Sequence, residues 1–362
     1  MNRIKTAIIG PGKVGHTHAR ILSALPESEL VAVLGRTPEK TQAFAAKYGV
    51  KGYTGLSEFL ATSGAQMVVI CTPHPLHAEA AVAAARAGIH IIVEKPMAVT
   101  VKQCDDMIAA AKANNVKLGM VSQRRLYECV RRVKQAIESG KIGIPILATI
   151  TVLGWRGPEY YAMDPWRGKW DAEGGGVLVN QTSHQLDLFQ WLMGPIDELF
   201  GYWDNLNHPY IEVEDTAVVV MRFRNGALGN IVVSNSQNPG LYGNIHIHGS
   251  NGASIGVQTD GGSMFISGVT TKVDPPINDI WTVAGEADLL PQWQAEDRAR
   301  ADQIDIMSHY HQLTVQDFLH AILEDRPPMV PGEEGRVTVE IFNAVYRSGR
   351  ERQVVKWPEE SE

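Results

Sequence analysis

The sequence predicts a protein of mixed class, α/β followed by α+β: a doubly wound parallel sheet comes first, and a larger, mainly antiparallel sheet follows it. Three observations support this prediction. Short apolar runs alternate with helical segments over the first third of the chain. Strand-like runs then follow one another with few helices between them. The length of 362 residues suits about two domains.

The N-terminal part contains five apolar runs that we expect to be strands: 4–10, 29–35, 65–73, 89–96 and 116–122. Helical segments separate them, and two of these segments stop at a glycine, Gly49 and Gly88. Buried strands that alternate with helices are typical of a parallel sheet covered on both faces. Residues 1–122 are therefore expected to form a doubly wound domain.

The pattern changes after residue 122. A helical segment, "YECVRRVKQAIESGKIG", precedes four strand-like stretches: "PILATITVLGW", "TAVVVMRFRNGALGNIVVSNS", "GNIHIHGS" and "ASIGVQTD". The "RNG" within the second stretch indicates a hairpin. Two further helices are expected at "SHQLDLFQWLMG" and "SHYHQLTVQDFLHAILED". We expect an α+β domain over residues 123–362.

Composition excludes several classes of protein. The net charge of −7 and the acidic pI disfavour a nucleic-acid or anionic-membrane binder. The three cysteines (Cys71, Cys104 and Cys129) are scattered and include no CxxC, so neither a disulfide framework nor a cysteine metal site is indicated. The first residues run straight into a strand, and no apolar run approaches the roughly 20 residues of a membrane span. A cytoplasmic protein is expected.

The stretch "GPGKVG" indicates a dinucleotide site. It follows a predicted strand, opens a helix and has the GxGxxG spacing. Gly10 permits a tight turn, Gly12 lets the backbone approach a pyrophosphate, and Gly15 lets the helix pack closely on the strand. The helix N-terminus, with Lys13 and Val14, supplies N–H donors and partial positive charge for phosphates.

The end of the second strand favours NADP(H). An acidic residue about 20 positions after the glycines usually binds the ribose hydroxyls of NAD(H). The sequence here is "LGRTPEK", which has no carboxylate at that place. Gly35 is expected to leave room for a 2′-phosphate, and Arg36 to pair with it. NAD(H), with Arg36 as a solvated charge, is the alternative.

Three motifs together resemble the Gfo/Idh/MocA family, which comprises glucose-fructose oxidoreductase, inositol dehydrogenase and related sugar oxidoreductases. They are "AIIGPGKVGHTHARIL", "VICTPHPLHAEAAVAAARAGIHIIVEKPMA" and "EGGGVLVNQTSHQLDLFQWLMG". The resemblance covers nearly the whole chain and keeps the motifs in order. It implies a Rossmann domain followed by an open-faced sheet domain, with the sugar bound between them.

The resemblance also implies catalytic residues. Lys95 matches the lysine of the family's EKP motif, which contacts the reacting hydroxyl. His184 matches the histidine of the GGG…H..D motif and is the expected acid/base, and Asp187 matches its supporting aspartate. Inositol dehydrogenases have an aspartate where this chain has Asn180, which leaves open how Lys95 and His184 share the work.

The chemistry of the residues agrees with this assignment. Oxidising a secondary alcohol by hydride transfer releases one proton, which needs a base within hydrogen-bond reach. A partly desolvated lysine beside a cationic nicotinamide, or a histidine, suits that role. If "NQTSHQLD" is helical, Asn180, His184 and Asp187 share one face. The alternative for His184 is a structural histidine.

Other residues are expected to support the site. Thr72 and Pro73 end a strand where open α/β sheets bind ligands. The further expected cofactor-binding residues are His77, Glu94, Gln123, Trp166 and Arg167. Trp170 is expected either to stack on a sugar face or to belong to the core of the second domain. Family members often have a cis bond before the EKP proline, a point that the sequence does not decide.

No metal is expected. His246 with His248, and His309 with His311, are paired at short spacing, but no cysteine or carboxylate stands near them in ligand spacing. The predicted function is an NAD(P)-dependent sugar or polyol dehydrogenase. The alternatives are a glycoside-cleaving enzyme with bound NAD that works by transient oxidation and elimination, and a non-catalytic sensor. A homodimer or homotetramer through the open sheet face is expected.

Overall fold

A computed structural model describes residues 3–261 and 274–357 of the chain. Its residues form two compact units. The first comprises residues 1–123 and 307–339, and the second comprises residues 124–306 and 340–362. In the described residues, every helix is too short or too polar to cross a bilayer.

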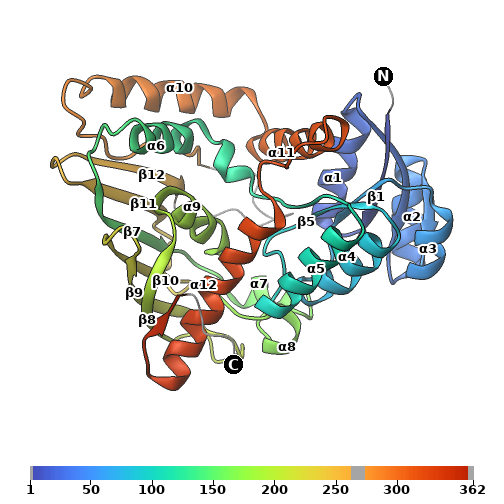
Figure 1. Cartoon of the computed structure of the whole chain (residues 1–362). Coiled ribbons are helices and arrows are strands. Elements are labelled where there is room, and N and C mark those ends of the chain that lie inside the picture. Colours follow the sequence, from blue (N-terminus) through green and yellow to red (C-terminus); the bar gives the residue numbers. More distant parts are fainter. Residues whose placement is uncertain (1–2, 262–273, 358–362) are drawn as a thin grey trace. The chain divides into compact units, whose positions relative to one another are not determined.

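The first unit contains a six-stranded, wholly parallel sheet (Figure 1), which confirms the predicted doubly wound domain. The strand order is β3-β2-β1-β4-β5-β6. The strands are β1 (Ile4–Ile9), β2 (Ser28–Leu34), β3 (Lys51–Tyr53), β4 (Met67–Ile70), β5 (His90–Val93) and β6 (Leu118–Met120). The order runs one way from β1 to β3 and the other way from β4 to β6, so the switch lies between β1 and β4.

The helices that join these strands are α1 (Lys13–Ala24), α2 (Pro38–Tyr48), α3 (Leu56–Thr62), α4 (His77–Arg86) and α5 (Val101–Ala113), with a short 3₁₀ turn at His74–Leu76. Neither β3 nor α3 is predicted from the sequence. The strand has only three residues, KGY, which is too short for an alternating pattern to be visible.

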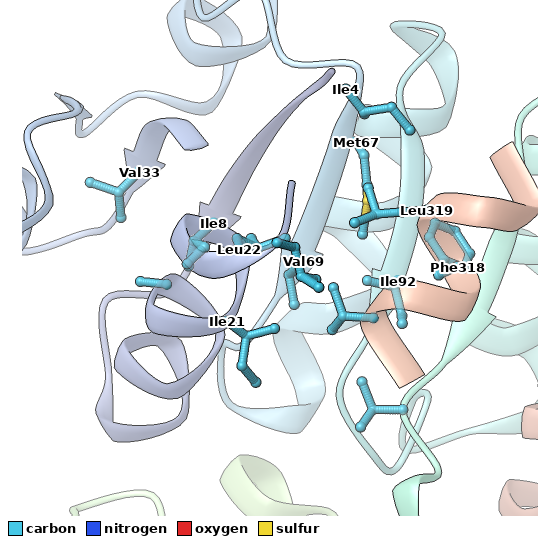
Figure 2. Packing of buried hydrophobic residues seen from close by; sticks show 14 of the residues in the cluster. Ile4, Ile8, Ile21, Leu22, Val33, Met67, Val69, Ile92, Phe318 and Leu319 are labelled. Atoms are coloured by element: carbon cyan, nitrogen blue, oxygen red, sulfur yellow. The ribbon is translucent and has the colours of Figure 1, made fainter. Parts of the chain in front are cut away.

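Helix α11 (Ile306–Leu323) packs on the core of the first unit, although it lies beyond residue 300 in the sequence. Phe318 and Leu319 belong to the same buried cluster as Met67 of β4 and Ile92 of β5, and Figure 2 shows them lying together. The division predicted from sequence assigned this segment to the second domain. The apolar face of α11 joins the first unit because it covers these strands, a contact that helical periodicity alone does not reveal.

The second unit contains a seven-stranded sheet of order β12-β11-β7-β10-β9-β8-β13. Its strands are β7 (Pro145–Leu153), β8 (Ile196–Asp204), β9 (Thr216–Phe223), β10 (Leu228–Ser234), β11 (Tyr242–Gly249), β12 (Ser254–Asp260) and β13 (Val355–Lys356). All neighbouring pairs are antiparallel except β7 and β10, so the predicted mainly antiparallel sheet is confirmed. The predicted hairpin joins β9 to β10, with Gly226 at a φ of 88°.

Helices cover one face of this sheet. Helix α9 (Ser183–Met193) contacts β7 and β11, α6 (Glu128–Glu138) contacts β12 and α9, and α10 (Leu289–Gln303) contacts α6. Two short helices, α7 (Pro158–Ala162) and α8 (Trp170–Glu173), precede α9, and α12 (Gly332–Glu351) contributes its C-terminal half. The other face carries exposed apolar side chains, among them Val218 and Val220 of β9.

Candidate active site

Most of the expected cofactor-binding residues follow the carboxyl ends of the parallel strands. Gly10 follows β1, Arg36 lies just beyond β2, Thr72 and Pro73 follow β4, and Lys95 lies just beyond β5. In an open α/β sheet this edge, at the switch between β1 and β4, is where ligands bind.

Each glycine of the GxGxxG stretch has the surroundings that its predicted role requires. Gly10 has a φ of 109°, and a Cβ there would lie 2.7 Å from the carbonyl carbon of Cys71. A Cβ at Gly15 would overlap the carbonyl oxygen of Gly10. At Gly12, by contrast, no described heavy atom lies within 4 Å of a Cβ position, so the backbone there is open to a ligand.

The residues of the first unit fit a dinucleotide. Helix α1 begins at Lys13 with no acidic residue in its first turn, and no described side chain caps it, so its first N–H groups remain available to phosphates. In the same unit, Thr72 Oγ1 and Gln123 Oε1 are buried without a hydrogen-bond partner among the described residues. Buried polar atoms rarely stay unpaired, and a bound ligand would supply their partners.

Gly35, just after β2, has a different role from the one expected from the sequence. A Cβ at Gly35 would lie 2.5 Å from Thr41 Oγ1 and 2.6 Å from Pro11 Cγ. The glycine is therefore required for packing within the unit, and the expected room for a phosphate on that side is already occupied. Arg36 itself is exposed at the ligand-binding edge.

His77 links two segments of that edge. Its ring is fully buried, with Nδ1 3.0 Å from the carbonyl oxygen of Pro96 and Nε2 2.8 Å from that of Thr72. Burial lowers the pKa of His77, so the neutral ring donates to one of the two carbonyls. The side chain therefore contacts both the segment after β4 and the segment after β5. The Lys95–Pro96 peptide bond is cis.

Glu94 anchors the backbone of Lys95. Its Oε1 lies 2.7 Å from His18 Nε2, and its Oε2 accepts the backbone N–H of Lys95 at 3.2 Å. Burial by itself would raise the pKa of Glu94, but the hydrogen bond and charge of His18, with His311 and Lys95 nearby, lower it to about 2. Glu94 is therefore ionised at neutral pH, and the half-buried Lys95 lies beside a fixed negative charge.

His18, Glu94 and His311 form one candidate metal-binding group among the described residues, with their ligand atoms within 4.8 Å of one another. This group is not predicted from the sequence because its three residues are far apart in the chain. His311 Nδ1 donates to the carbonyl of Met307 at 2.7 Å, as a metal-ligating histidine would. His18 Nδ1, however, is buried without a partner among the described residues. Nδ1 is unsatisfied whether Nε2 binds a metal or donates to Glu94, so this atom does not distinguish a metal site from a proton network.

In the second unit, the predicted helical face is wrong in one respect. Helix α9 begins at Ser183, so Asn180 precedes the helix and does not share its face with His184 and Asp187. Thr182 stands at the N-cap and the glycine run lies just upstream. His184 is half-buried in the first turn of α9.

The side chains around Asn180 form a polar cluster. Its amide donates to Glu173 Oε1 and, at 3.1 Å, to the hydroxyl of Tyr160. Arg167 Nη1 donates to the same hydroxyl at 2.5 Å, and its guanidinium stacks on Trp166. Position 180 has an amide and not a carboxylate, and the carboxylate of Glu173 lies directly beside it.

Two of the expected site residues are engaged elsewhere in the second unit. Both oxygens of Asp187 accept hydrogen bonds from Arg125, at 2.8 Å from Nε and 2.6 Å from Nη2. The ring of Trp170 packs edge-on against Trp203 and Tyr346, with centroids 5.5 and 5.2 Å away. The packing of Trp170 agrees with the core alternative, and Asp187 is bound to Arg125 instead of facing a ligand.

Comparisons with known proteins agree with this description. Residues 4–122 match the oxidoreductase family model with an NAD-binding Rossmann fold, and residues 130–255 match the Gfo/Idh/MocA C-terminal domain. The chain is 27% identical to myo-inositol 2-dehydrogenase of Thermotoga maritima, over 98% of this chain and 99% of that one. It is 24% identical to scyllo-inositol 2-dehydrogenase (NAD+) of Bacillus subtilis, over 96% of this chain and 95% of that one.

A solved structure is also similar over its full length. It is that of the WlbA dehydrogenase from Bordetella pertussis, in complex with NADH and UDP-GlcNAcA. The TM-score is 0.84 at 30% identity, with 99% of this chain and all of that one covered. Both parts of the chain match the same family, in the expected order and around the motifs described above. The chain therefore belongs to the Gfo/Idh/MocA family and is an NAD(P)-dependent oxidoreductase.

Proposed function

We propose that this chain interconverts a secondary hydroxyl and a ketone on a sugar, glycoside or cyclic polyol, with Lys95 and His184 handling the proton. The named relatives that act on inositols, and the neighbour with a bound nucleotide sugar, support this substrate class. When bound, a nicotinamide would accept or donate the hydride. The residues of the chain bind and orient the reactants and move the proton.

The observation that carries the proposal is the anchoring of Lys95. Its backbone N–H is bound by the ionised Glu94, and it follows β5 at the ligand-binding edge of the sheet. The backbone that carries the Lys95 side chain is therefore fixed in position. An amine held within hydrogen-bond reach of a substrate hydroxyl is suited to exchange a proton with it.

The test compares wild type with Lys95→Met and His184→Asn on a panel of inositols, pyranoses and nucleotide sugars. We expect either substitution to reduce kcat about 100-fold or more, because general acid–base catalysis contributes about 10²–10⁴-fold. Dinucleotide binding, followed by tryptophan quenching, should change little in His184→Asn. Full activity in both variants would overturn the proposal.

The same assay separates the alternatives. A dehydrogenase accumulates reduced dinucleotide in solution as substrate turns over. An enzyme that oxidises transiently and eliminates would release a cleaved product without that accumulation. A sensor would bind dinucleotide or sugar and turn over neither. The dehydrogenase names of the relatives favour the first outcome.

We propose further that Arg36 gives the site a preference for NADP(H). The exposed guanidinium follows β2, and no carboxylate stands in "LGRTPEK" before Glu39. A guanidinium pairs with a 2′-phosphate through two hydrogen bonds. Titration of wild type and Arg36→Ala with both dinucleotides tests this. A preference for NADPH that is lost in the variant supports the proposal. A preference for NADH that is unchanged in the variant would mean that NAD(H) is the cofactor, as in the NADH-bound neighbour.

We propose that the open face of the second sheet joins copies of this chain. The register places Tyr202 of β8 opposite Val218 of β9, and Leu147 of β7 opposite Leu228 of β10, all exposed on one face. Single exposed apolar residues are common on monomers, whereas a contiguous exposed apolar patch is typical of an interaction surface. Val220→Glu should lower the mass measured by light scattering. Leu323→Glu, at an exposed site of the first unit, is the control. A monomeric wild type would contradict the proposal.

A further inference from the structure

Glu214 lies beneath the glycine run that precedes His184. Its carboxylate accepts three hydrogen bonds: from the backbone N–H of Gly176 at 2.8 Å, from that of Leu178 at 3.0 Å, and from the hydroxyl of Tyr346 at 2.8 Å. The backbone carbonyl of Glu214 also accepts the N–H of Val177 at 3.1 Å. One buried residue therefore holds three consecutive residues of the loop.

The glycine run fits closely against Glu214 and Tyr346. A Cβ at Gly175 would overlap the hydroxyl of Tyr346, and a Cβ at Gly176 would overlap the carbonyl oxygen of Glu214. Gly175 also has a φ of 154°, which side-chain-bearing residues rarely adopt. The glycines are needed because the loop backbone lies directly on Glu214 and Tyr346.

Hydrogen bonds from the loop backbone fix the residues that follow it. The carbonyl of Gly176 accepts the N–H of Asn180 at 2.9 Å, and the carbonyl of Val177 accepts both the N–H and the hydroxyl of Thr182. Thr182 is the N-cap of α9, and its carbonyl accepts the N–H of Leu186. A continuous hydrogen-bonded path therefore runs from Glu214 to Asn180 and to the first turn of α9, which carries His184.

The proposed proton chemistry does not use Glu214 or Tyr346. Both are buried, so neither is placed to touch a substrate. Burial raises the pKa of Glu214 to about 7, although the three hydrogen bonds oppose the rise. Burial of a carboxylate is unfavourable unless its oxygens are bound. The cost is offset here by donors that all come from the loop and from one tyrosine.

We infer that Glu214 and Tyr346 are positioning residues, which set the place of Asn180 and His184 through the glycine run. This inference rests on the proposed role of His184. A small displacement of a catalytic group costs up to about 100-fold in rate. The two residues therefore act on turnover without contacting the reacting atoms.

The test uses Glu214→Gln, Tyr346→Phe and a matched control, Ser348→Ala. The glutamine keeps the shape but turns one acceptor into a donor that faces a backbone N–H. The phenylalanine removes one hydrogen bond and leaves both loop N–H bonds in place. Ser348 lies on the same helix as Tyr346 and is equally buried, but its hydroxyl bonds to Gly201 and Val345, away from the loop.

We expect kcat to fall about 10- to 100-fold in Glu214→Gln and by less in Tyr346→Phe, with the KM for dinucleotide unchanged. Ser348→Ala should keep the wild-type kcat even where its unfolding midpoint falls. A merely structural role would lower the midpoint in all three variants and leave kcat per folded molecule the same, and that result would overturn the inference.

A second measurement separates this inference from the proposed function. The imidazole signal of His184, assigned by its loss in His184→Asn, is followed by NMR in each variant. It should shift in Tyr346→Phe and stay in place in Ser348→Ala. If wild type turns over no substrate of the panel, the proposed function fails while this signal still tests the positioning. An unmoved signal in Tyr346→Phe, with unchanged kcat, would refute the inference even if Glu214→Gln does not fold.

Discussion

The Nε2 atom of His18 lies 2.7 Å from Oε1 of Glu94, although 76 residues separate them in the sequence. His18 is on α1, which opens at the glycine stretch, and Glu94 precedes the lysine proposed to move the proton. The bond therefore joins the dinucleotide motif to the EKP motif within the first unit. Both features are needed at one edge of the sheet, and this contact holds them there.

Glu94→Gln should destabilise the first unit at neutral pH by about 1.5–3 kcal/mol, the usual contribution of a hydrogen bond to a charged group. The pKa of Glu94 is depressed to about 2, so its stabilisation is present above the unfolded value near 4.5 and is lost as pH falls toward 2. Urea unfolding of both proteins at several pH values measures this. A difference that stays constant from pH 7 to pH 4 and below would contradict the assignment of the charge.

Glu214 should show the opposite dependence on pH. Its pKa is raised to about 7, so its contribution to stability is fully present below the unfolded value near 4.5 and is lost as pH rises through 7. Wild type should therefore lose about 3 kcal/mol relative to Glu214→Gln between pH 4.5 and 8. The difference between the two unfolding curves isolates this residue from other titrating groups. Parallel curves over that range would show that Glu214 is not the titrating group.

The pair of Arg125 and Asp187 is fully buried, and each side chain is 1–2% exposed. Removing one partner leaves an uncompensated buried charge, so Asp187→Ala should cost about 3–5 kcal/mol. The matched control is Asp106→Ala, which breaks the exposed pair with Lys102 and should cost less than about 1 kcal/mol. Denaturant unfolding measures both variants. Equal losses in the two would mean that the buried pair contributes little.

Gly12→Ala and Gly15→Ala should separate ligand binding from folding. A Cβ at Gly12 meets open space, so this variant should keep the wild-type unfolding midpoint and lose affinity for dinucleotide. A Cβ at Gly15 overlaps the carbonyl of Gly10, so this variant should unfold at a lower temperature. Thermal unfolding with and without NAD(P)H shows both effects. Unimpaired binding in Gly12→Ala would mean that the phosphates do not approach that backbone.

The features predicted correctly from the sequence depend on neighbours along the chain. The parallel strands were visible because each apolar run is bounded by turns and followed by a helix. The roles of Gly10 and Gly15 could be assigned because the turn and the helix are contiguous with the motif. The hairpin between β9 and β10 is also local. Strand β3 is not predicted because its three residues are too few to show an alternating pattern.

The features that only the tertiary structure decided depend on residues far apart in sequence. Asp187 pairs with Arg125, and His311 lies beside Glu94. Neither contact can be predicted from the periodicity of apolar residues in the sequence. The glycine run was recognised as a motif, but the carboxylate beneath it, Glu214, lies 38 residues from Gly176. The sequence by itself determined the class of fold, the family and the motifs, since these are encoded in local patterns. The partners of each charged side chain were decided by packing, because burial selects them from the whole chain.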